Sequence, residues 1–286
     1  MISVIVPVYE HWHLVPGLLA RLEAQTLPHT EFEVLLVDNG SSQFDPPDVL
    51  PVNARVLHWS TPGSYSARNH ALEQARGEWI AFTDADCLPQ ADWLEQMQRE
   101  ADACGTRPTV LAGAIHMLRS SDRPNAYEMY DLVKGIPQGW YVSRGYATTA
   151  NLAVPTALLT SLNGFDAHRY SGADAAFCRK AVASGASLRY VPDAAVDHPA
   201  RNSWRALATK ARRVKGGQLT GGTRRQRAHW LLRTFTPPVI AFWRFMHTPD
   251  QPLQYRLTAV AVQFRIWVLE MGEAIRLVAR GAAERR

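Results

Sequence analysis

Residues 77–86 read Gly77-Glu78-Trp79-Ile80-Ala81-Phe82-Thr83-Asp84-Ala85-Asp86. The middle of this run is a short apolar stretch of the kind that forms a fully buried strand. Two carboxylates, Asp84 and Asp86, follow it directly. Mg²⁺ and Mn²⁺ prefer oxygen ligands and are often held by one or two carboxylates together with the phosphates of a substrate. The run therefore predicts a buried strand that ends at a metal site, although an Asp-x-Asp pair also occurs in solvated turns.

Strands and helices alternate on both sides of this run. We expect strands over residues 2–7, 32–37, 54–59, 78–83 and 110–116, and helices over residues 14–24, 64–75 and 93–104. Near-continuous apolar strands that alternate with helices are typical of a parallel sheet covered on both faces. The predicted fold class is therefore α/β, with a mostly parallel central sheet flanked by helices.

Polar residues follow three of the expected strands. They are Pro7-Val8-Tyr9-Glu10, Asp38-Asn39-Gly40-Ser41-Ser42 and Asp84-Ala85-Asp86. Sheets of this class bind ligands beyond the carboxyl ends of their strands, so we expect the site at that edge. Asp38 suits recognition of a base or a ribose there, and it equally suits an Asx turn.

The net charge changes sign near residue 198. Residues 1–198 carry 14 Lys and Arg against 22 Asp and Glu, a net charge of −8, whereas residues 199–286 carry 17 against 4, a net charge of +13. Apolar residues between Leu257 and Val278 recur at helical spacing. We therefore expect a domain over residues 1–198 and a basic helical extension over residues 199–286.

The composition also bears on the compartment. Met1 leads directly into the first expected strand without the basic residues of a signal peptide, and no run of 18 uncharged apolar residues occurs. The cysteines Cys87, Cys104 and Cys178 fit neither a disulfide framework nor a zinc site. These features predict a cytoplasmic protein in a reducing compartment.

Basic and aromatic residues are mixed in the extension. This mixture suits contact with the anionic inner face of the cell membrane, and it also suits a solvated basic face on helices packed against the domain of residues 1–198. No nucleic-acid recognition motif accompanies the charge, so nucleic acid is not an expected partner.

Further short motifs follow one another in a fixed order. They are Val4-Ile5-Val6-Pro7-Val8-Tyr9, Val37-Asp38-Asn39-Gly40-Ser41, Ala67-Arg68-Asn69, residues 77–86, Ala150-Asn151-Leu152-Ala153, Asn163-Gly164-Phe165-Asp166, Gly172-Ala173-Asp174 and residues 190–198. Together they resemble a family 2 glycosyltransferase of the GT-A fold over roughly residues 1–198. The resemblance implies inverting transfer of one sugar from a nucleotide-diphosphate sugar, with a UDP-sugar expected, to an acceptor hydroxyl in bacterial-type polysaccharide or glycoconjugate synthesis.

This resemblance divides residues 1–198 into two halves. Residues 1–115 would bind the nucleotide-sugar, and residues 116–198 would supply the acceptor site and the catalytic base. On the donor side, Tyr9 would stack on the base and Asp38 would accept its hydrogen bond. Arg68 would lie near the phosphates, because a planar guanidinium suits oxyanions. Further substrate contacts are expected at Pro7, Ala85 and Asn151.

The metal ligands and the base also follow from the resemblance. Asp86 and His198 would bind Mn²⁺ or Mg²⁺, and Asp84 would contact the metal or the ribose. Asp174 would take the proton from the acceptor hydroxyl, although it also suits the start of a helix near Ala175.

Two features concern the acceptor. Ala173 stands where relatives often have Glu, which removes a like charge that would raise the pKa of Asp174. Trp140, in a segment rich in aromatic residues, is expected beside the acceptor sugar, unless these aromatics only pack. The acceptor itself is expected to be a glycan or a lipid-linked molecule.

Three other functions would be expected to leave different signals in the sequence. Processive synthases carry Gln-x-x-Arg-Trp, which the string Gln226-Arg227-Ala228-His229-Trp230 does not match. A sugar nucleotidyltransferase would carry a Gly-rich, Arg-containing loop after its first strand, where this chain has Pro7-Val8-Tyr9-Glu10. A catalytically inactive nucleotide-sugar-binding scaffold subunit is the other alternative, and Ala173 is the one hint of it.

Overall fold

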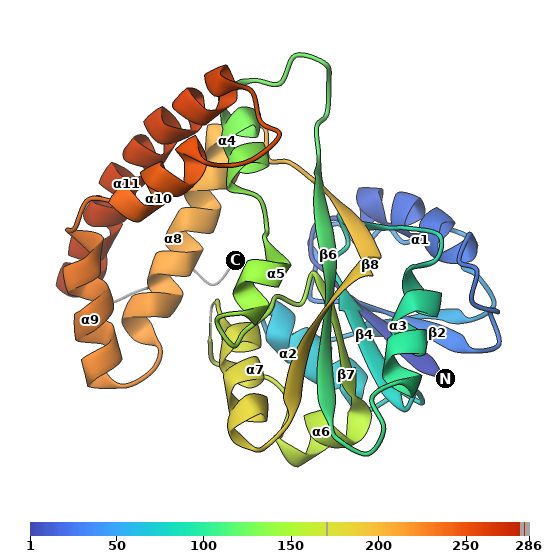
Figure 1. Ribbon diagram of the computed structural model, residues 1–286. Coiled ribbons are helices and arrows are strands. Elements are labelled where there is room, and N and C mark those ends of the chain that lie inside the picture. The colour runs from blue at the N-terminus through green and yellow to red at the C-terminus, as the bar shows by residue number, and fades with distance from the viewer. Residues whose placement is uncertain (170, 281–282, 284–286) are drawn as a thin grey trace. The chain divides into compact units, whose positions relative to one another are not determined.

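The computed structural model describes residues 1–169, 171–280 and 283 (Figure 1). The chain divides into two compact units. Unit 1 comprises Met1–His116, Pro137–Ala167 and Ala173–His198, and unit 2 comprises Met117–Ile136, His168–Gly172 and Pro199–Arg286. Residues 117–136, which the sequence groups with the acceptor half, thus belong to unit 2.

An eight-stranded sheet, counted over the described residues, forms the centre of unit 1, in the order β3-β2-β1-β4-β7-β6-β8-β5. The strands are β1 (Ile2–Val8), β2 (Phe32–Asp38), β3 (Ala54–His58), β4 (Trp79–Thr83), β5 (Leu88–Pro89), β6 (Thr109–Leu118), β7 (Asn151–Pro155) and β8 (Ser187–Pro199). The β-branched and leucine residues of β1 and β2 are buried almost throughout, as expected of strands covered on both faces.

The register of the parallel strands places their polar ends together. Val8 pairs with Asp38 between β1 and β2, and Ile5 pairs with Phe82 between β1 and β4. The residues that follow β1, β2 and β4 therefore lie at one edge of the sheet, as the sequence predicts for Tyr9, Asp38 and Asp84.

The predicted α/β class is confirmed, but the sheet is mixed. Parallel pairing is found between β3, β2, β1 and β4, whereas β7 pairs antiparallel with both β4 and β6, and β5 pairs antiparallel with β8. In the β4–β7 pair Thr83 lies opposite Asn151, so β7 starts at the site edge and runs away from it. Buried strands show the same apolar pattern in either direction, so the sequence pattern does not reveal this reversal.

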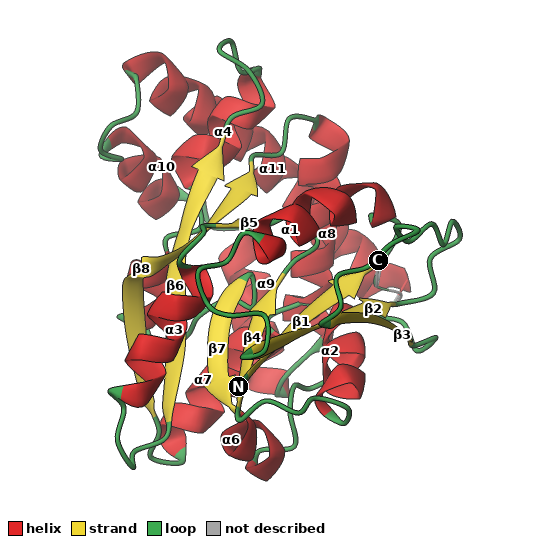
Figure 2. Ribbon diagram, turned by 90° about the vertical axis from the view of Figure 1, so that its right-hand side faces the viewer, coloured by secondary structure: helices red, strands yellow, loops and turns green. Residues whose placement is uncertain are grey.

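Helices cover both faces of the sheet (Figure 2). Those of unit 1 are α1 (Val15–Glu23), α2 (Ser64–Leu72), α3 (Trp93–Asp102), α5 (Gln138–Val142), α6 (Thr156–Ser161) and α7 (Ala173–Ala183). Side chains alternate along β1, so Val4 and Val6 join one core with residues of α1 and α3, while Ile5 joins a second core with residues of α2, α6 and α7. The strands that end at the site edge are thus packed between two hydrophobic cores, one on each face of the sheet.

Unit 2 is helical. Its elements are α4 (Ala126–Lys134), α8 (Trp204–Thr220), α9 (Arg224–Thr234), α10 (Val239–Met246) and α11 (Leu253–Arg280), and α11 packs against the other four. Their shared core includes Tyr130, Leu207, Phe245, Val262 and Ile266. None of the helices in the described part of the chain is long and apolar enough to cross a bilayer.

A buried carboxylate supports unit 2. Asp131 of α4 accepts hydrogen bonds from the backbone N–H of Arg201 at 2.9 Å and from its guanidinium at 3.2 Å. Burial by itself raises the pKa of Asp131. The positive charges of Arg201 and Lys210 and the backbone hydrogen bond lower it by more than burial raises it, so the net pKa lies below its ordinary value. The folded state therefore favours the charged form.

We expect Asp131→Asn to lower the free energy of unfolding at pH 7 by about 3 kcal/mol, because it leaves the partly buried guanidinium of Arg201 poorly paired. Since the pKa is lower in the folded state, this stabilisation is complete above the unfolded value of about 4 and is lost as the pH falls through the folded value. Urea unfolding at pH 7 and at about pH 3 measures the difference.

The matched control is Asp122→Asn, because this carboxylate is 98% exposed and its pair with Arg119 spans 3.5 Å. It should change the stability little at either pH. An equal loss for Asp131→Asn at both values would contradict an electrostatic role.

Candidate functional site

The strand pairings around β4 bring the candidate ligands together. Asp84, Ala85 and Asp86 form the turn that follows β4, in which the Cys87 N–H donates to the Asp84 carbonyl at 3.0 Å. β5 comes next and pairs with the end of β8, with Leu88 opposite Asp197. This short pairing places His198, the neighbour of Asp197, beside Asp86.

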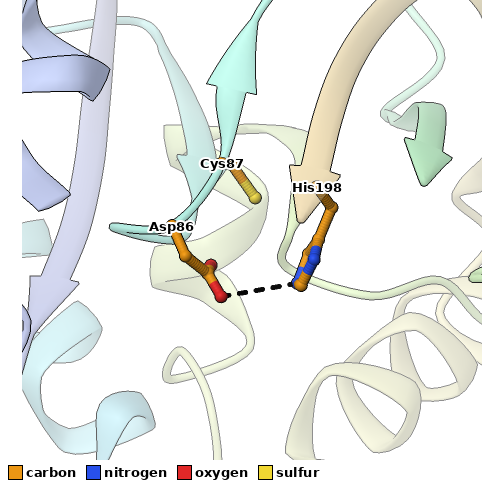
Figure 3. A group of neighbouring side chains, drawn as sticks. All are labelled: Asp86, Cys87 and His198. Atoms are coloured by element: carbon orange, nitrogen blue, oxygen red, sulfur yellow. Dashed lines mark ion pairs between the residues drawn. The ribbon is translucent and has the colours of Figure 1, made fainter. Parts of the chain in front are cut away.

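Asp86 and His198 face each other across this pairing (Figure 3). The Asp86 Oδ2 lies 3.7 Å from the His198 Nε2, and the Cys87 Sγ completes a group whose ligand atoms lie within 4.8 Å of one another. His198 is buried, whereas Asp86 is partly exposed, so a ligand reaches this group from the Asp86 side. A carboxylate beside an imidazole suits Mn²⁺, and the exposed side leaves room for the oxygens of a substrate.

Cys87 is the member of this group that the sequence interpretation did not include. Burial, followed by the charges of Asp84 and Asp86, raises the pKa of its thiol well above the ordinary value. The thiolate is the form that binds metal, so a thiol held neutral is a poor ligand. Asp86 and His198 are therefore the side chains of this group that suit a hard divalent cation.

Asp84 interacts with Arg68 rather than with His198. The Asp84 Oδ1 lies 2.5 Å from a guanidinium nitrogen of Arg68 in α2, and Arg68 is only 2% exposed. The Nε of this guanidinium is buried and makes no hydrogen bond within the described residues. The structure thus brings two of the three predicted metal ligands together and gives the third a buried arginine as its partner.

Asp174, at the start of α7, is joined to α2 through a tyrosine. Its Oδ1 accepts hydrogen bonds from the Tyr65 hydroxyl at 3.1 Å and from the Ala175 N–H at 2.8 Å, and its Oδ2 accepts from the Thr149 N–H at 3.4 Å. Burial raises the pKa of Asp174, and these hydrogen bonds together with the charge of Arg68 partly offset the rise. The carboxylate therefore supports the helix start while keeping a raised pKa.

Tyr65 was not among the predicted residues. It precedes Arg68 by one helical turn, and the guanidinium carbon of Arg68 lies 5.7 Å from the centre of its ring. The spacing of three residues on α2 was the available signal, since it places both side chains on one helix face. A continuous series of contacts, Asp84–Arg68–Tyr65–Asp174, results.

The edge at β2 contains a second residue that the sequence interpretation missed. The Trp12 indole N–H donates to the Asp38 Oδ1 at 3.0 Å, and the Gly40 N–H donates to the Asp38 Oδ2 at 3.2 Å. Asp38 is almost wholly buried, so its carboxylate holds the turn as an Asx residue does. Tyr9 and Pro7, at the neighbouring end of β1, are half-buried.

Asn151, predicted to contact the substrate, is fully buried. Its amide nitrogen donates to the carbonyls of Ala114 at 2.8 Å and Ala194 at 2.9 Å, and its Oδ1 accepts from the Trp93 indole at 2.8 Å. The side chain thus ties β6, β7 and β8 together behind the site. Ala85 is buried in the turn between the two carboxylates.

Trp140 lies on α5 and is 42% exposed. The guanidinium carbon of Arg144 lies 4.9 Å from the centre of its ring, and the ring of Tyr141 contacts its edge. The side chain is therefore accessible to a ligand, and its role beside an acceptor stays a prediction.

Known proteins are similar to this chain in sequence. The family model "Glycosyl transferase family 2" matches residues 3–182. Glycosyltransferase AglE from Haloferax volcanii is 32% identical over 228 residues, which cover 76% of this chain and 73% of that protein. The pre-mycofactocin glycosyltransferase from Mycobacterium tuberculosis is 29% identical over 189 residues, which cover 62% of this chain and 40% of that protein.

Solved structures share the fold. A complex of Staphylococcus aureus TarS residues 1–349 with UDP-GlcNAc superposes with a TM-score of 0.53 at 20% identity, covering 97% of this chain and 81% of that chain. The mannosyltransferase PcManGT from Pyrobaculum calidifontis, in complex with GDP-Man and Mn²⁺, gives a TM-score of 0.58 at 17% identity, covering 97% of this chain and 86% of that one. At these identities the likeness concerns the fold.

The family match spans well over half of the chain, and it includes the strand edge at which Asp84, Asp86, Arg68 and Asp174 lie. The sheet order, the helices on both faces and the structural neighbours agree with it. The chain therefore belongs to glycosyl transferase family 2 and is a glycosyltransferase of the GT-A fold.

Proposed function

We propose that the enzyme transfers a single sugar, with inversion, from a nucleotide-diphosphate sugar to an acceptor hydroxyl. The observation that carries this proposal is the series Asp84–Arg68–Tyr65–Asp174, which links the carboxylate after β4 to a buried carboxylate of raised pKa. A donor-binding charge pair and a candidate base are thereby held in one rigid arrangement. We propose a UDP-sugar as the donor, and the TarS complex with UDP-GlcNAc offers a precedent on the same fold.

The donor would lie along the edge formed by β1, β2 and β4. In this proposal Tyr9 stacks on the base, and Asp38 accepts a hydrogen bond from it with the carboxylate lone pairs that Trp12, Gly40 and Ser41 leave available. Pro7 and Ala85 line this edge through their backbone. Arg68 faces the diphosphate, because its planar guanidinium suits oxyanions and the ion pair with Asp84 uses one of its nitrogens.

Asp86 and His198 would hold a Mn²⁺ or Mg²⁺ ion, and Asp84 would orient the ribose or complete the ligand set. The Asp86–His198 pair fits such an ion through its donor atoms and its exposed side. When bound, the ion would neutralise the charge that develops on the departing diphosphate.

Asp174 would act as the general base. Its raised pKa brings the carboxylate closer to the pH of the cell, where a base is most effective. It would take the acceptor proton as that oxygen attacks the anomeric carbon and the bond to the diphosphate breaks, which inverts the configuration. Asn151, which is enclosed by three strands, would position the site without touching the substrate.

The acceptor would lie on the side of Trp140, whose exposed ring suits stacking on a sugar. We propose a glycan or a lipid-linked acceptor, a role in polysaccharide or glycoconjugate synthesis, and a cytoplasmic location at the inner face of the membrane. The unpaired cysteines of the described chain are consistent with a reducing compartment.

A donor panel tests this function. UDP-, GDP- and dTDP-sugars are incubated with the enzyme and Mn²⁺, nucleotide release and donor binding are measured, and NMR gives the anomeric configuration of the product. Metal-dependent release from one donor with inversion is the expected result. Binding without turnover in the presence of acceptors would favour the inactive scaffold, and pyrophosphorolysis of the donor would favour a nucleotidyltransferase.

We further expect Tyr65→Phe to shift the acidic limb of the kcat profile to higher pH. The Tyr65 hydrogen bond lowers the pKa of Asp174, so its loss raises that pKa, and a higher pH is then needed to deprotonate the base. Losing one hydrogen bond predicts about a fivefold lower kcat at a given pH on the acidic limb, and kcat recovers as the pH rises.

Tyr130→Phe is the matched control, since its hydroxyl bonds to the Gln263 Oε1 at 2.9 Å within unit 2. It should leave the acidic limb in place. A Tyr65→Phe loss that is the same at every pH would mean that the hydroxyl serves the fold alone.

A further inference from the structure

Helix α11 is apolar on two opposite faces. One face is buried: Ala259, Val262 and Ile266 belong to the core of unit 2, and Ala274 and Leu277 continue the buried face. The other face is exposed and presents Leu253, Leu257, Phe264, Val268, Ile275 and Val278. Val278, at 69% exposure, shows how open this face is. A large exposed apolar face ordinarily marks an interaction site, so the outward face of α11 indicates a partner.

The segment before α11 adds to the exposed apolar area. Leu232, Phe235, Val239, Ile240 and Trp243 lie on α9, on α10 or between them, and all are exposed. Ile240 and Trp243 are 69% and 65% exposed and lie one turn apart on α10. Exposed Trp side chains often rest at the boundary between lipid headgroups and acyl chains.

Positive charge accompanies these side chains. Residues 199–249 contain 11 Lys and Arg and no Asp or Glu. The exposed cations among them are Arg205, Arg213, Arg224, Arg225 and Arg233, on α8 and α9. A positively charged segment beside exposed apolar side chains complements a lipid bilayer, whose surface is anionic and whose interior is apolar.

We propose that unit 2 binds an anionic lipid bilayer. The exposed apolar side chains of α9–α11 enter the headgroup region, and the arginines of α8 and α9 bind the phosphates. The inference rests on the membrane location in the proposed function, but lipid binding can be measured without turnover. A failure to bind lipid and a failure to transfer sugar are therefore distinguishable.

A second copy of the chain is the other occupant to consider. Together with Ala261 and Met271, the outward residues of α11 from Leu257 to Val278 recur at alternating steps of four and three, the spacing of a coiled-coil seam. Such seams are usually flanked by charges of both signs, but Thr258, Arg265, Gly272 and Ala279 flank this one on one side and supply no acid. The positive segment would also face its own copy, which opposes pairing.

Vesicle co-sedimentation of the full chain tests the proposal. Binding to vesicles that contain phosphatidylglycerol is expected at low salt, with weaker binding at high salt and on phosphatidylcholine alone. The double variant Ile240→Ser with Trp243→Ser, and separately Phe264→Ser with Val268→Ser, should weaken binding by about tenfold or more, because burial of these side chains is lost. Arg224→Gln with Arg225→Gln should weaken vesicle binding at low salt and reduce its dependence on salt.

Val49→Ser with Val52→Ser is the control, because these side chains are exposed in unit 1. Its binding should equal that of the wild type, and circular dichroism of all variants checks the fold. Absence of binding to anionic vesicles would overturn the proposal. A dimer that light scattering detects, and that the α11 substitutions abolish without changing lipid binding, would assign that face to a second copy instead.

Discussion

Asp174→Asn is expected to lower kcat by about 10²- to 10⁴-fold, the range that a positioned general base supplies. The amide oxygen of asparagine can still accept the hydrogen bonds of Tyr65 and Ala175, so the start of α7 should be preserved. The amide cannot take the acceptor proton. Donor binding should therefore stay near the wild-type value, and acceptor-dependent turnover shows the whole loss.

The control for this variant is Asp193→Asn, an exposed carboxylate of β8 in the same unit. Its turnover should match that of the wild type. If Asp174→Asn retained full turnover at saturating donor and acceptor, another group would be the base and Asp174 would only begin the helix.

Asp86→Ala is expected to abolish measurable Mn²⁺ binding and to lower kcat/KM by at least about a hundredfold. The substitution removes the exposed carboxylate of the pair and leaves His198, which is buried, as a lone ligand. Isothermal titration with Mn²⁺ measures the metal directly, and titration with the donor in the presence and absence of Mn²⁺ shows how far donor binding depends on it.

Two further variants sharpen this result. Asp102→Ala removes an exposed carboxylate at the end of α3 and should change neither metal binding nor turnover. Cys87→Ala should keep the Mn²⁺ affinity, because its raised pKa leaves the thiol protonated. A large loss of Mn²⁺ affinity in Cys87→Ala would make the thiol a ligand and would exclude a simple carboxylate–imidazole site.

The strands and helices around the site edge could be predicted from the sequence because their patterns are local. The expected strand over residues 32–37 is β2, Phe32–Asp38, and the expected helix over residues 93–104 is α3, Trp93–Asp102. The apolar period of a strand or a helix appears within a few residues. Strand direction depends on how distant segments meet, so the antiparallel entry of β7 could not be predicted in this way.

The same distinction applies to the site. Asp84, Asp86 and Arg68 could be proposed from the sequence because they occur in motifs of fixed spacing. The partner of Asp174 is Tyr65, 109 residues earlier in the chain, and no local pattern links the two. The occupied amide of Asn151 was equally hidden, because its partners lie on β6, β8 and α3.

The Asn151 amide also has a consequence for engineering. A side chain at Gly113 would place its Cβ 2.3 Å from the Asn151 Nδ2 and 2.2 Å from the Ala194 carbonyl, so the three strands meet with no spare volume. Gly113, Asn151 and Ala194 therefore form a tightly packed junction beneath the more exposed segments of the site. Under the proposed function, the segment that bears Trp140 would be the one to exchange for a change of acceptor preference, with positions 113 and 151 kept fixed.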